Sequence, residues 1–73
     1  MKADQLLAVL LRSPLDYRII RQSGSHRRLV SRSRPANPVT FAYHHGTTVD
    51  PMAVRDLLVN TVGLDEDEAV ELL

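Results

Sequence analysis

The sequence predicts an α+β fold, a two-layer sandwich in which one helix, three strands and two helices follow in chain order. The spacing of apolar residues is helical in residues 4–11, strand-like in residues 17–43 and helical again after residue 51. With 73 residues, the chain is long enough for a single domain, residues 1–73. Short connections between the strands favour an antiparallel meander, with the helices covering its apolar face.

The first helix is expected to begin at Asp4, which is a suitable N-cap, and to end before Pro14. Leucines recur within it at helical spacing, at Leu6, Leu7, Leu10 and Leu11. We interpret this stripe as core packing.

Three strands are expected next, at residues 17–22, 26–32 and 39–43. Ser23 and Gly24 predict a turn between the first two strands, and the segment 34–38, with two prolines, predicts a second turn. In the third strand one face would carry Val39, Phe41 and Tyr43. The other face of the sheet would carry the arginine side chains and face solvent or a ligand.

Residues 44–48 are expected to form a loop before two helices. Asp50 and Pro51 predict a helix start, and Gly63 predicts its end. One face of this helix would carry Val54, Leu57, Leu58, Thr61 and Val62. The segment 64–73 predicts a short last helix with an acidic first turn. Its core-facing residues would be either Val70 and Leu73, or Ala69, Leu72 and Leu73.

Composition narrows the class of protein. The chain has no cysteine, so it forms no disulfide and no thiolate metal site. The longest apolar run, residues 6–11, is too short to span a bilayer and lacks a signal-peptide cleavage pattern. We therefore expect a cytoplasmic protein without a membrane partner. A chain this short also cannot enclose a deep cofactor cleft, so we expect no small-molecule cofactor.

The charge is divided between the two parts of the chain. Residues 1–48 carry eight basic and two acidic side chains, a net charge of +6, whereas residues 49–73 carry one basic and seven acidic side chains, a net charge of −6. Such asymmetry indicates a polyanionic partner, although the two parts could instead neutralise each other in the fold. Eight of the nine basic residues are arginine, whose planar fork suits phosphate.

The strongest candidate site is Gly24-Ser25-His26 at the tip of the predicted hairpin, beside Arg21 and the pair Arg27-Arg28. RNA carries its own nucleophile, the 2′-hydroxyl, so one well-placed base is enough to activate it against the adjacent phosphate without a metal. Arginine would stabilise the charge that develops on phosphorus. The alternative is that His26 only hydrogen-bonds the turn.

The other histidines are adjacent to each other in a loop. His44 and His45 lie far from His26 in sequence, and no acidic residue accompanies them at ligand spacing, so we expect no metal site. Either one could protonate the leaving 5′-oxygen of a cleaved RNA, or be a polar loop residue.

The hairpin segment resembles the signature of the HicA-type toxins, also called YcfA-like proteins, which are small mRNA interferases of bacterial and archaeal toxin–antitoxin systems. The matching residues are Tyr17, Ile19, Ile20 and the run Arg21-Gln22-Ser23-Gly24-Ser25-His26. Three later segments also resemble the family in their order along the chain and in their length: His45-Gly46, the helix segment 54–58 and Gly63-Leu64. The resemblance covers nearly the whole chain.

This resemblance implies a double-stranded-RNA-binding-domain-like fold of order α-β-β-β-α, here with an extra short C-terminal helix. It implies an endoribonuclease that cleaves mRNA without a metal, inhibits translation and is bound by a HicB-type antitoxin. The catalytic residue would be His26. Of the two loop histidines, His45 is the candidate for a second acid or base, a role that rests on the chemistry of RNA cleavage and not on the resemblance. The residues expected to bind RNA are Arg21, Ser25, Arg27, Arg28 and Arg32. A non-catalytic RNA-binding module and a protein-interaction module on the same fold are the alternatives.

Overall fold

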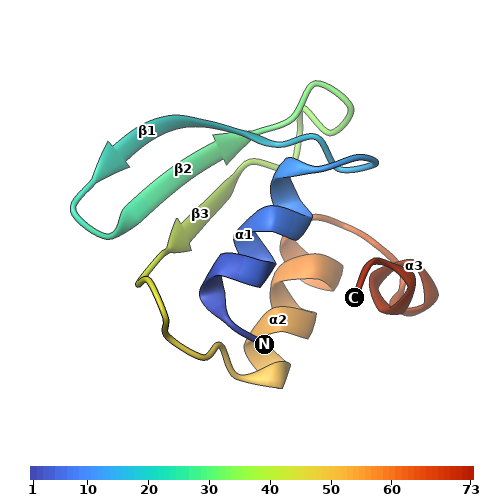
Figure 1. Cartoon of the computed structure of the whole chain (residues 1–73). Helices are drawn as coiled ribbons and strands as arrows, with labels where there is room; N and C mark the ends of the chain where they lie inside the picture. The colour runs from blue at the N-terminus through green and yellow to red at the C-terminus, as the bar shows by residue number, and fades with distance from the viewer.

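The computed structural model describes residues 1–73 and has the expected α+β architecture, with a three-stranded antiparallel sheet and three helical segments (Figure 1). In chain order the elements are α1 (Ala3–Leu11), β1 (Arg18–Ser23), β2 (His26–Val30), β3 (Val39–Ala42), α2 (Pro51–Asp56), η1 (Leu57–Thr61) and α3 (Glu66–Leu72). The short segment η1 is a π-helical continuation of α2. No helix has the length and apolar character needed to cross a membrane.

The sheet is the predicted meander, with strand order β1-β2-β3. Gly24 and Ser25 form the two-residue loop of the β1–β2 hairpin, and Ser23 pairs with His26 at its base. Gly24 has a φ of +58°, and no other hairpin loop residue has a positive φ. A type II′ turn requires this arrangement, and glycine adopts it without steric penalty.

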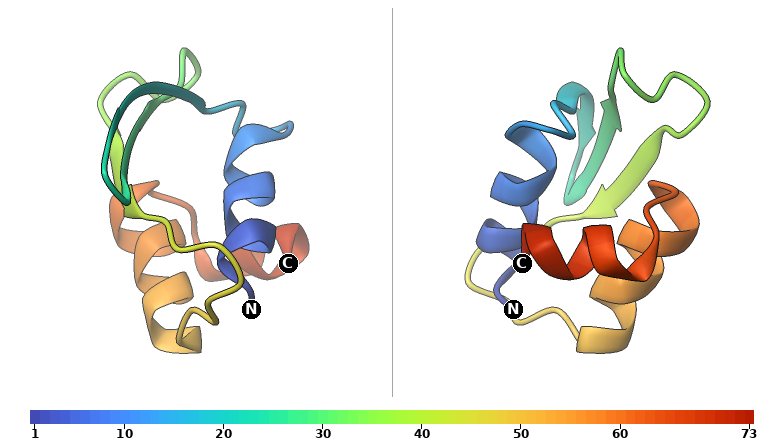
Figure 2. Two further views of the ribbon diagram at one scale, coloured as in Figure 1. Left: turned by 60° about the vertical axis from the view of Figure 1, so that its left-hand side comes forward. Right: turned by 90° about the vertical axis from the view of Figure 1, so that its right-hand side faces the viewer.

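The core lies between the sheet and the helices. The sheet contributes Leu29, Val39 and Phe41, which are buried on one face. Helix α1 lies against this face, and α2 runs beside β3 (Figures 1 and 2). The helical segments and their flanking turns contribute the other buried apolar side chains: Ala3, Leu6, Val9, Leu10, Leu15, Tyr17, Val54, Leu58, Val62, Leu64 and Ala69. The opposite face of the sheet is called the open face below.

Helix α1 begins earlier than predicted. Its N-cap is Lys2 rather than Asp4, and the Lys2 backbone N–H donates a hydrogen bond to the Gln5 Oε1 at 2.9 Å. The helix already ends at Leu11, before Pro14. The carboxylate of Asp4 is thereby free to contact groups elsewhere in the fold.

The α2–η1 segment begins and ends at the predicted signals. The Asp50 side chain accepts a hydrogen bond from the Met52 backbone at the start of α2, and Gly63 follows η1 with a φ of +90°. Helix α3 is shorter than predicted, because Asp65 caps it. Ala69 and Leu72 face the core, as the second of the two predicted sets has it. Val70 and Leu73, which make up the first set, are exposed.

Candidate nucleic-acid interface

His26 is the first residue of β2 and is exposed to solvent. Its imidazole makes no hydrogen bond within the protein, so the interpretation that it only hydrogen-bonds the turn is not supported. The two-residue loop holds the ring at the hairpin tip, away from the core. The imidazole is therefore open to a ligand.

Two arginines lie on the same face as His26. Side chains alternate between faces along a strand, so His26 and Arg28 share the open face while Leu29 points into the core. Arg21 is the cross-strand partner of Arg28 and is exposed beside it. The Arg28 guanidinium donates to Thr40 Oγ1 at 3.3 Å, which orients it on this face. An imidazole and two guanidinium groups thus form one exposed cluster, His26, Arg21 and Arg28.

Arg27 does not join this cluster. Arg27 is two residues before the buried Leu29 on β2, so the two side chains lie on the same, core-facing side of the sheet. Its guanidinium lies 5.3 Å from the centre of the Tyr43 ring. The same guanidinium donates a 2.7 Å hydrogen bond to the Gly24 carbonyl. The expectation that the sheet arginines all line the open face is therefore wrong for Arg27. Its contacts brace the hairpin loop from the core-facing side.

His45 lies in a second cluster, on the side of the sheet where α1 packs. Its Nδ1 is 3.2 Å from Asp4 Oδ2 and 3.2 Å from the hydroxyl of Tyr43, which also donates a hydrogen bond to Asp4. Tyr43 packs edge-on against Phe41, one of the core residues. Since His26 belongs to the open face, the structure does not bring the two imidazoles together at one phosphate.

The hydrogen bond to Asp4 raises the pKa of Tyr43, and burial and the negative charge of Asp4 act in the same direction. The nearby Arg27 opposes this shift. Asp4 is the residue of this cluster that sequence reasoning missed, because its position before the leucine stripe is equally typical of a helix cap. A contact between residues 4 and 43 has no local signal in the sequence.

The remaining predicted residues lie around the hairpin. Ser25 is partly buried in the loop, and its carbonyl accepts a 2.7 Å hydrogen bond from the Tyr43 backbone. Arg32 follows β2 and is exposed, next to Arg18. His44 is an exposed loop residue with no side-chain partner. No group of three or more His, Asp or Glu side chains converges in the structure.

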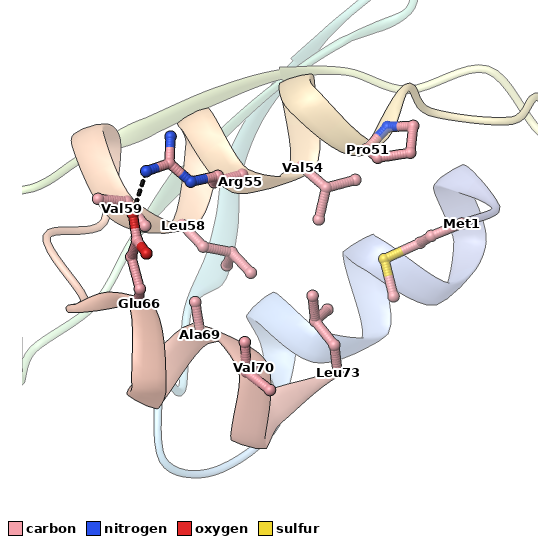
Figure 3. Close-up of a pocket in the computed structure, with 10 residues that line it drawn as sticks. All are labelled: Met1, Pro51, Val54, Arg55, Leu58, Val59, Glu66, Ala69, Val70 and Leu73. Carbon is pink, nitrogen blue, oxygen red and sulfur yellow. Dashed lines mark hydrogen bonds and ion pairs between the residues drawn. The ribbon is translucent and has the colours of Figure 1, made fainter.

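A separate groove of about 320 Å³ lies between α2, α3 and the N-terminus (Figure 3). Most of its lining is apolar, and the ion pair between Arg55 and Glu66 lies at one end. The apolar lining residues are Met1, Pro51, Val54, Leu58, Val59, Ala69, Val70 and Leu73. A groove of this character does not suit phosphate, so the open face is the better candidate for a nucleic acid.

No family model, no curated protein and no solved structure matches this chain. The candidate site therefore depends on the geometry of the open face and on the residues of the hairpin.

Proposed function

We propose that the protein is a HicA-type mRNA interferase, a metal-independent endoribonuclease that acts as the toxin of a toxin–antitoxin system. The observation that carries this proposal is the exposed cluster of His26, Arg21 and Arg28 on one face of the hairpin. The order of helices and strands, with α3 as an addition, is compatible with the double-stranded-RNA-binding-domain-like fold that the hairpin motif implies. A HicB-type antitoxin is the proposed protein partner.

In the proposed reaction, the RNA backbone lies across the open face. The neutral imidazole of His26 accepts the proton of a ribose 2′-hydroxyl, and the oxygen attacks the adjacent phosphorus. A bond forms between O2′ and phosphorus, the bond between phosphorus and O5′ breaks, and water protonates the leaving 5′-oxygen. The products are a 2′,3′-cyclic phosphate and a 5′-hydroxyl end.

The guanidinium groups have a distinct role in this reaction. Arg28 is two residues from His26 on the same strand, which corresponds to roughly 7 Å between their Cα atoms. Its side chain and that of Arg21 can therefore reach the phosphate whose neighbouring ribose contacts His26. Both groups carry donors in a fixed fork that matches phosphate oxygens, so they stabilise the negative charge that builds up in the transition state.

The test is to compare the wild-type protein with His26→Ala on a defined single-stranded RNA in the presence of a chelator. We expect the wild type to leave cyclic phosphate ends and the variant to lose at least about 100-fold in rate, as is typical when a general base is removed. His44→Ala is the matched control, because His44 is also exposed and has no side-chain partner. Equal cleavage by His26→Ala and wild type would refute the catalytic assignment.

A non-catalytic RNA-binding module is the second candidate. It is favoured by the unpaired arginines of the hairpin, which bind a backbone without any help from His26. This candidate predicts salt-sensitive binding that survives His26→Ala, with no cleaved product at any enzyme concentration. A protein-interaction module would instead show no RNA affinity after removal of its protein partner.

A further inference from the structure

A polar hollow lies at the end of the hairpin that is remote from His26. It has a volume of about 400 Å³ and is lined by Asp16, Arg18, Arg32 and Ser33, with no apolar side chain. Arg18 pairs with Val30 at the far end of the β1–β2 ladder, whereas His26 pairs with Ser23 at the loop. The hollow and His26 therefore lie at opposite ends of the same two strands.

The arginines of this hollow have no partner in the protein. Six of the nine basic side chains interact with a neighbouring residue of the fold: Lys2, Arg12, Arg27, Arg28, Arg34 and Arg55. The other three, Arg18, Arg21 and Arg32, make no hydrogen bond or ion pair, and all three belong to the hairpin or follow it directly. Asp16 also lines the hollow but forms no ion pair with either arginine, so two positive charges face one negative charge.

The walls of the hollow are held in place by buried hydrogen bonds. Ser31 is buried, with 3% of its surface exposed. Its hydroxyl donates to the Leu15 carbonyl at 2.6 Å and lies 3.0 Å from the Ser33 hydroxyl. Leu15 precedes Asp16, and Ser31 precedes Arg32, so this contact ties together the two segments that carry the hollow. These hydrogen bonds hold the backbone around the hollow without a bound ligand, so binding has to order only the arginine side chains.

We infer that this hollow binds a backbone phosphate of the RNA strand whose scissile phosphate lies at His26. The inference rests on the proposed function for the identity of the ligand. Val30, the ladder partner of Arg18, is four residues from His26 along β2, about 13 Å at the rise of a β-strand. One phosphodiester does not span this distance, so the substrate must be a strand of several nucleotides laid along the hairpin, with Arg21 and Arg28 between the two ends.

The experiment measures binding rather than cleavage. A fluorescent RNA octamer with 2′-O-methyl groups throughout lacks the nucleophile and stays intact. Its affinity is measured by anisotropy between low and moderate salt for the wild type and for Arg18→Gln/Arg32→Gln. The control is Lys2→Gln/Arg55→Gln, which also removes two positive charges, but from residues outside the hairpin. Circular dichroism confirms that the variants fold.

We expect the Arg18→Gln/Arg32→Gln variant to bind the octamer about tenfold more weakly than the control at low salt. Its salt dependence should be shallower by about 0.7 in the slope of log K against log salt, the value for one phosphate contact on a single strand. Equal affinity and slope in the two variants would overturn the subsite even if the wild type cleaves RNA. A subsite confirmed by binding in a protein that never cleaves RNA would instead refute the proposed catalysis.

Discussion

Arg21 and Arg28 are direct cross-strand partners on the open face of the sheet. Like charges placed opposite each other destabilise a sheet, and no carboxylate forms an ion pair with either residue. The only hydrogen bond that the two guanidinium groups make is the one from Arg28 to Thr40. The pair thus destabilises the folded protein when no ligand is bound. An anion bound between the two groups would relieve their repulsion.

The first prediction concerns this repulsion. Arg21→Thr should raise the free energy of unfolding by about 0.2–1 kcal/mol at low salt, because it removes the like-charge contact and places a β-branched residue in a strand. The gain from charge should vanish at about 1 M salt, where the screening length is only about 3 Å. Urea denaturation at low salt and at about 1 M salt measures the difference in the free energy of unfolding between the variant and the wild type.

Gln22→Thr serves as the control for β-propensity, since Gln22 is the uncharged neighbour on the same strand. The same Arg21→Thr protein should bind RNA more weakly than the wild type. If it is no more stable than the control at low salt, the proposed repulsion is absent.

The second prediction concerns alkaline pH. The chain has two tyrosines, and the pKa of each is raised above its usual value, by Asp4 for Tyr43 and by burial for Tyr17. A raised pKa means that the folded state holds the phenolic proton more tightly than the unfolded state. Stability from these groups is therefore complete below about pH 10 and is lost as the pH rises through the folded-state pKa values.

Ultraviolet titration of the phenols tests the cause of the Tyr43 shift. Asp4→Ala should move one of the two ionisations to lower pH, toward the ordinary value of about 10. Tyr43→Phe should leave only the Tyr17 ionisation in the titration curve, which shows which of the two wild-type ionisations belongs to Tyr43. An unchanged titration curve for Asp4→Ala would show that the carboxylate does not hold the Tyr43 hydroxyl.

The third prediction concerns the hairpin loop. A Cβ atom added at Gly24 would meet no atom within 4 Å, so only the positive φ of +58° resists substitution. Gly24→Ala should therefore destabilise the protein by about 1–2 kcal/mol. Gly24→Asn should destabilise it by less, because asparagine is more common than alanine at the positive-φ positions of hairpin turns. Thermal unfolding of the two variants gives the comparison. Equal losses for alanine and asparagine would contradict a purely conformational cause.

The fourth prediction concerns the buried hydroxyl of Ser31. Ser31→Ala removes the 2.6 Å hydrogen bond to the Leu15 carbonyl and should lower the free energy of unfolding by about 1–3 kcal/mol. Ser33→Ala should have a smaller effect, since its hydroxyl is 3.5 Å from the same carbonyl and the residue is exposed. Urea denaturation gives the free energy of unfolding of each of the two variants. A larger loss for Ser33→Ala would show that Ser31 does not join these segments.

Several parts of the site could be predicted from short stretches of sequence. Gly24 marks the hairpin loop, and the Asp50-Pro51 pair and Gly63 mark the ends of the α2–η1 segment, because each signal acts through the backbone of its immediate neighbours. The separation of Arg27 from Arg28 also has a local signal. Adjacent strand residues point to opposite faces, so only one of the two could join His26 on the open face.

The sequence alone predicts the order of helices and strands, the antiparallel meander and the presence of an imidazole among arginines at the hairpin. These features follow from periodicity and turn chemistry over a few residues. The packed fold is needed to show that Asp4 meets His45 and Tyr43, that Ser31 joins Leu15, and that Arg18 and Arg32 share one hollow. These contacts join residues distant in the chain, and which side chains meet there depends on how the helices and turns pack against the sheet.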